Sequence, residues 1–70
     1  MTPGEAVVHV LGEAGEPLHW TVIQDRALRA GLLDPFSTPN VRNDVLTAVR
    51  ALVADGRITK TATGVYAIVG

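Results

Sequence analysis

The sequence predicts a small α+β domain in which three helices are followed by a two-stranded β-hairpin. Apolar residues recur at helical spacing in three separate segments, a glycine follows each segment, and the residues after Gly56 are rich in β-branched side chains. With 70 residues, the chain is expected to form one domain, spanning 1–70, around one small core. The sequence ends at Gly70 directly after an apolar run, so this domain can also be the first one of a longer natural chain.

Composition excludes several classes of protein. The chain has no cysteine, which excludes a disulfide framework, an iron–sulfur cluster and a thiolate zinc site. Its hydrophobic share of 47% is far from that of a disordered chain. No apolar run approaches the roughly 20 residues of a membrane span, and the acidic start is unlike a secretory signal. We therefore expect a compact cytoplasmic module that does not contact a membrane.

The first helix is expected from about Pro3 to Ala14. Thr2 and Glu5 have the spacing of a capping box, and Pro3 occupies the first helical position between them. Gly15 then fits the position after a helix, where a left-handed backbone is common. Four apolar side chains share one face of this helix: Val7, Val10, Leu11 and Ala14.

A short strand and a second helix are expected next. Pro17 blocks continuation of the first helix, and residues 18–20 form a short extended segment. Thr21 and Gln24 have the spacing of a second capping box, which opens a helix that ends at Gly31. The inward face of this helix carries Ile23, Ala27 and Leu28.

The third helix is expected to be the longest, and a proline-rich loop leads into it. Turns at Asp34-Pro35 and Ser37-Thr38-Pro39 flank Phe36, which is expected to close the edge of the core. Ser37 or Thr38 is the expected cap, with Pro39 at the first helical position and Gly56 at the end. An apolar stripe follows one face: Val41, Val45, Ala48, Val49 and Leu52, widened by Leu46 and Val53. The opposite face carries Asn40, Asn43, Thr47, Arg50 and Ala54.

The remaining residues are expected to form a β-hairpin. Residues 57–61 and 65–69 have strand composition, and Ala62-Thr63-Gly64 forms the turn between them. Alternation places Ile58, Tyr66 and Ile68 toward the core, and Val65, Ala67 and Val69 on the outer face. Trp20 and Tyr66 are expected to serve the core rather than to stack on bases. The apolar outer face of the last strand is a candidate surface for a homodimer or another partner.

This order of elements is that of a winged helix, in which the short strand joins the hairpin and the third helix can enter a DNA major groove. Four segments add to the likeness: Pro17-Leu18-His19-Trp20, Thr38-Pro39, Asp55-Gly56-Arg57-Ile58 and Gly64-Val65-Tyr66-Ala67-Ile68. With them the chain resembles the HARE-type helix-turn-helix family, a winged-helix variant, over about residues 5–68. The resemblance implies a non-catalytic module attached to DNA-modifying, restriction, chromatin or transcription proteins.

The charges are distributed unevenly along the chain. Residues 1–35 hold five acids and two bases, whereas residues 36–70 hold two acids and four bases. In the major groove, asparagine can pair with adenine and arginine with guanine. Arginine and lysine can both contact phosphates. The candidate DNA-binding residues therefore lie in the second half: Asn40, Arg42, Asn43, Thr47, Arg50, Arg57 and Lys60. Because the total charge is only −1, a single copy is expected to bind duplex DNA weakly.

Two other functions remain open from the sequence. The domain can dock onto a polymerase or another DNA-acting protein without touching bases, or it can dimerise through the outer face of its last strand. An enzyme is not expected, because no nucleophile is paired with a base and the chain is too short for a shielded pocket. His9 and His19 lie in different elements without a third ligand at metal spacing, so we expect no metal or cofactor.

Overall fold

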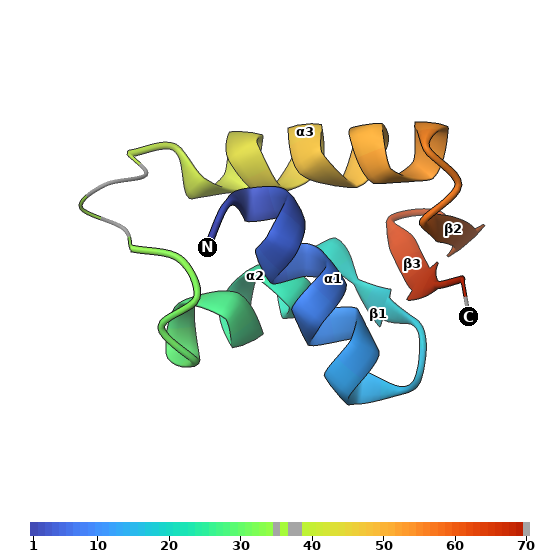
Figure 1. The fold of residues 1–70 in the computed structure, drawn as a ribbon, viewed down its shortest axis with the longest axis horizontal. Coiled ribbons are helices and arrows are strands. Elements are labelled where there is room, and N and C mark those ends of the chain that lie inside the picture. The colour runs from blue at the N-terminus through green and yellow to red at the C-terminus, as the bar shows by residue number, and fades with distance from the viewer. Residues whose placement is uncertain (35, 37–38, 70) are drawn as a thin grey trace.

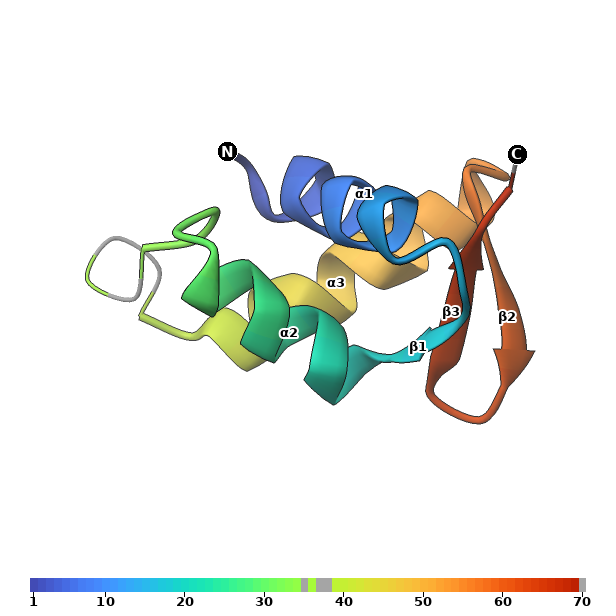
Figure 2. The same ribbon diagram turned by 90° about the horizontal axis from the view of Figure 1, so that it is seen from below.

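The computed structural model describes residues 1–34, 36 and 39–69. Its elements are α1 (Pro3–Ala14), β1 (Leu18–His19), α2 (Trp20–Arg29), α3 (Val41–Ala54), β2 (Ile58–Ala62) and β3 (Val65–Ile68), as Figure 1 shows. The strands form one antiparallel sheet in the order β1-β3-β2, so the short first strand joins the hairpin as predicted. The sheet lies at one end of the molecule beside the three helices (Figure 2), which is the predicted α+β winged-helix arrangement.

Helix α1 begins and ends where the sequence predicts. The Glu5 backbone N–H donates to Thr2 Oγ1, and the Thr2 N–H donates to Glu5 Oε1, each over 3.2 Å. These two bonds complete the capping box, which satisfies donors that a helix N-terminus leaves unpaired. At the other end, Gly15 has a φ of 64°, the left-handed conformation that closes the helix.

The capping box makes part of the stability of α1 depend on pH. The hydrogen bonds from the Thr2 backbone and then from its side chain hold the pKa of the Glu5 carboxyl below its ordinary value of 4.5. The stabilisation is therefore fully present above pH 4.5 and is lost as the pH falls through the lowered folded pKa. We expect wild type to exceed Glu5→Gln in Tm at about pH 6, with the difference shrinking toward about pH 3. Thermal unfolding followed by circular dichroism measures both, and a difference independent of pH would contradict this role.

Helix α2 begins two residues earlier than predicted, at Trp20, and its cap is His19 rather than Thr21. The Trp20 N–H donates to the Gly64 carbonyl over 2.9 Å, which is the last bond between this segment and the hairpin. The chain then turns into the helix, and His19 Nδ1 accepts the Thr21 N–H over 3.3 Å. The predicted capping box is therefore wrong, and Gln24 Oε1 is buried without a hydrogen-bond partner among the described residues.

The start of α3 also differs from the prediction. Asn40 is the cap, because its Oδ1 accepts the Asn43 N–H over 3.2 Å, and the helix begins at Val41. Pro39 therefore precedes the helix instead of opening it. The predicted caps Ser37 and Thr38, and Pro35 of the predicted turns, lie outside the described residues.

Phe36 does not close the core, because 96% of it is exposed. Its backbone N–H donates to Asp34 Oδ1 over 2.9 Å, which holds a turn rather than a core contact. Leu33 is the buried residue of this segment, with 4% exposed, so the chain has already left the core before it reaches Phe36.

One apolar cluster joins the three helices to the sheet. Its buried members are Ala6, Val7, Val10, Leu11, Leu18, Ile23, Ala27, Leu33, Val45, Val49, Leu52 and Ile58. The apolar stripe predicted for α3 is confirmed at its centre, although Val53 at its margin is 38% exposed. None of the helices within the described residues combines the length and the apolar character needed to cross a bilayer.

The hairpin is confirmed with a shorter turn than predicted. Ala62 pairs with Val65 and so belongs to β2, and the ladder shifts register between Lys60 and Ala62. This irregularity is a β-bulge, which bends a strand at the cost of one unpaired residue. Ile58 is buried and pairs with Ile68, so this end of the hairpin faces the core as expected.

Candidate functional site

Two cations that are distant in sequence converge between α3 and the sheet. Arg50 of α3 and Lys60 of β2 line one hollow of about 380 Å³, together with Val53 and Tyr66. Lys60 pairs with Tyr66 across the hairpin, so their side chains lie on the same face of the sheet. Neither cation takes part in a salt bridge within the part of the chain that the structure describes. Their positive charge therefore remains available to an anionic partner.

Tyr66 connects this hollow to the core. Its side chain is partly buried and packs against the apolar cluster, which confirms the predicted core role. The same residue also lines the hollow with Arg50 and Lys60. Tyrosine suits such a position because its ring is apolar and its hydroxyl can donate to a polar partner.

A third cation, Arg42, lies over an aromatic ring at the other end of α3. The Arg42 guanidinium carbon lies 5.4 Å from the centre of the Trp20 ring, which is within cation–π distance. The His19 ring is also adjacent, with 5.7 Å between the ring centres and an angle of 34°. Trp20 is half-buried and does not belong to the core cluster, so the predicted core role is wrong. As the first residue of α2, it lies at the margin of the core instead.

Arg42, Leu46 and Arg50 follow one another at four-residue intervals, so they share one side of α3. That side has Trp20 near one end and Lys60 with Tyr66 near the other. We call this surface the basic face: Arg42, Arg50 and Lys60 with the rings of Trp20 and Tyr66. Only its cations were candidates from the sequence. Its two aromatic members were not, since nothing in the sequence relates position 42 to position 20.

The remaining candidate residues are more dispersed. Asn43 and Thr47 are exposed on α3, but Thr47 borders a different hollow with Asp44 and Pro3. Asn40 uses its carbonyl oxygen to cap α3, which leaves its amide N–H groups as donors. These residues flank the basic face without forming part of its hollow.

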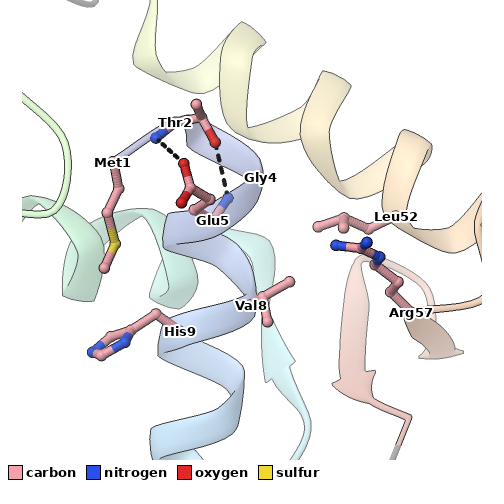
Figure 3. Close-up of a pocket in the computed structure, with 8 residues that line it drawn as sticks. All are labelled: Met1, Thr2, Gly4, Glu5, Val8, His9, Leu52 and Arg57. Carbon is pink, nitrogen blue, oxygen red and sulfur yellow. Dashed lines mark hydrogen bonds between the residues drawn. The ribbon is translucent and has the colours of Figure 1, made fainter.

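Arg57 is separated from the other cations of the second half. It lines a hollow of about 440 Å³ with Leu52 and the N-terminal turn of α1, as Figure 3 shows. Glu5 and His9 border the same hollow. Arg57 therefore lies apart from the hollow that Arg50 and Lys60 share.

The acidic half of the chain neutralises one of its own cations. Arg29 Nε lies 3.0 Å from Asp25 Oδ2 one turn away on α2, whereas the three cations of the basic face lack such a partner among the described residues. Arg26 and Arg57 also lack a salt bridge among the described residues, so three of the five unpaired cations lie on the basic face. No family model, curated protein or solved structure matches this chain.

Proposed function

We propose that this domain is a non-catalytic DNA-binding module in which α3 enters the major groove and the β2–β3 hairpin lies along the phosphate backbone. The convergence of Arg50 and Lys60 on one hollow, without an acidic partner among the described residues, carries the proposal. Unpaired cations on one face favour a polyanion. The HARE-type resemblance supports a place beside machinery that modifies, restricts or transcribes DNA.

The residues of α3 have different roles in this proposal. Asn43 and Thr47 are exposed and uncharged, so they contact base edges. Arg50 and Lys60 contact phosphates, as does Arg42. Three phosphate contacts give a slope of about −3 in log K against log salt, so a single copy binds weakly at physiological salt. A dimer or a linked domain raises the effective affinity without new contacts.

Fluorescence anisotropy with a labelled duplex at low salt tests the proposal. Arg50→Ala with Lys60→Ala is expected to weaken binding at least about tenfold and to reduce the salt slope by about 2. Arg26→Ala with Arg29→Ala is the matched control, because it removes the same charge from α2 and leaves the basic face intact. No wild-type binding at about 50 µM protein, or equal losses in both double variants, would contradict DNA binding by this face.

A docking or dimerisation domain is the alternative proposal. Phe36 is 96% exposed and Val69 at the end of β3 is 55% exposed, and both favour an apolar partner. Val65 and Ala67 are already half-buried, so the outer face of β3 adds little further apolar area. Arg50→Ala with Lys60→Ala separates the two proposals. It should weaken DNA binding, whereas binding to an apolar partner should be unchanged.

A further inference from the structure

We propose that Trp20 is a positioning residue that holds the Arg42 guanidinium ready for a second phosphate contact on the basic face. This inference rests on the proposed DNA binding, and it assigns a function to the contact between Trp20 and Arg42. Neither residue is needed by the core: Arg42 is exposed and Trp20 lies outside the buried cluster.

Trp20 is held in place by several elements. Its backbone N–H donates to the Gly64 carbonyl over 2.9 Å, which ties it to the turn of the hairpin. It is also the first residue of α2, directly after the His19 cap, and the His19 ring lies beside its own. A ring anchored to both α2 and the hairpin is a fixed platform for a flexible side chain from α3.

Arg42 gains orientation from this platform without losing its hydrogen-bonding capacity. A guanidinium that lies over an aromatic ring is attracted through its face, which leaves the N–H groups at its edge free to donate. Within the described residues, Arg42 has no salt bridge that would occupy those donors. A phosphate can therefore accept two parallel hydrogen bonds from an arginine that is already oriented.

The position of Arg42 complements that of Arg50. Eight residues of helix separate them, which corresponds to about 12 Å along α3. Phosphates of one DNA strand follow one another at about 3.4 Å along the helix axis, so two arginines this far apart can reach different phosphates. Trp20 with Arg42 then forms one contact, and Arg50 with Lys60 forms the other.

A double-mutant cycle in duplex binding distinguishes this role from simple support of the fold. Trp20→Leu is expected to weaken binding by about twofold to fivefold, as the loss of an exposed cation–π contact implies. Arg42→Gln is expected to weaken binding further and to reduce the salt slope by about 0.9. The double variant should bind like Arg42→Gln alone, because Trp20 acts through Arg42. Trp20→Phe should restore most of the affinity, since phenylalanine still presents a ring.

Several outcomes would overturn the inference while leaving the proposed function intact. These are wild-type binding by Trp20→Leu, or penalties that simply add in the double variant. If Trp20→Leu does not fold, the fluorescence of Trp20 in folded protein tests the inference instead. Trp20 is the single tryptophan of the chain, so the signal comes from this site alone. Duplex DNA should then change the emission of wild type and leave that of Arg42→Gln unchanged, and equal responses overturn the inference. If wild type binds no duplex at all, the proposed function and this inference fail together.

Discussion

Ile23→Ala is expected to destabilise the domain by about 2–5 kcal/mol. Ile23 of α2 is fully buried, with 0% exposed, within the cluster that joins the helices to the sheet. Its truncation removes apolar burial and leaves a cavity that the neighbouring side chains fill only in part. A 70-residue domain has a total stability of roughly 4–10 kcal/mol, so this one substitution removes a large share of it.

Val22 provides the matched control for this prediction. It is adjacent to Ile23 on the same helix and is also β-branched, but it is 37% exposed. Both substitutions to alanine raise helix propensity by a similar small amount, so the difference between them reports burial. Urea unfolding should show a much lower midpoint for Ile23→Ala than for Val22→Ala. Similar midpoints would show that α2 does not contribute to the core as the structure describes.

The elements that the sequence predicts correctly are those with local signals. The start of α1 depends on Thr2 and Glu5, which lie within one turn of each other, and the structure has both hydrogen bonds. The buried stripe of α3 follows from helical periodicity alone, because residues at three- and four-residue spacing share a face. In these cases the interacting atoms belong to one element, so no knowledge of the tertiary arrangement is required.

The incorrect predictions share a dependence on distant contacts. Thr21 has the residue type and spacing of a cap, but the hydrogen bond from Trp20 to Gly64 fixes where the strand ends and makes His19 the cap. Phe36 has the character of a core residue, yet Leu33 already occupies the core from that segment. Local propensity cannot show which of several suitable residues the tertiary fold uses.

The basic face was only partly predictable for the same reason. Arg50 and Lys60 were candidates as individual cations, but their convergence depends on how the hairpin packs beside α3. Arg57 was also a candidate, and the structure places it in another hollow, which the first turn of α1 helps to line. The contact of Arg42 with Trp20 joins α3 to α2, so periodicity within either helix could not reveal it.

Gly64→Ala is expected to lower the free energy of unfolding by about 1.5–4 kcal/mol, from two effects that add. The first is the backbone, since Gly64 has a φ of 73° and a left-handed conformation costs other residues about 1–2 kcal/mol. The second is steric, because a Cβ at Gly64 would lie 2.7 Å from His19 Nε2. The His19 ring cannot move freely, as its Nδ1 accepts the Thr21 N–H and caps α2. Loss of that cap accounts for about 0.5–2 kcal/mol.

Gly56→Ala separates the two effects. Gly56 has a similar φ of 75°, but a Cβ there meets nothing within 4 Å, so only the backbone cost applies. Thermal unfolding should therefore show a larger loss for Gly64→Ala than for Gly56→Ala. In a His19→Ala background the excess should disappear, because the clash and the cap are then both absent. An excess that persists without the His19 ring would mean that the hairpin turn, rather than its contact with the cap of α2, sets the cost at Gly64.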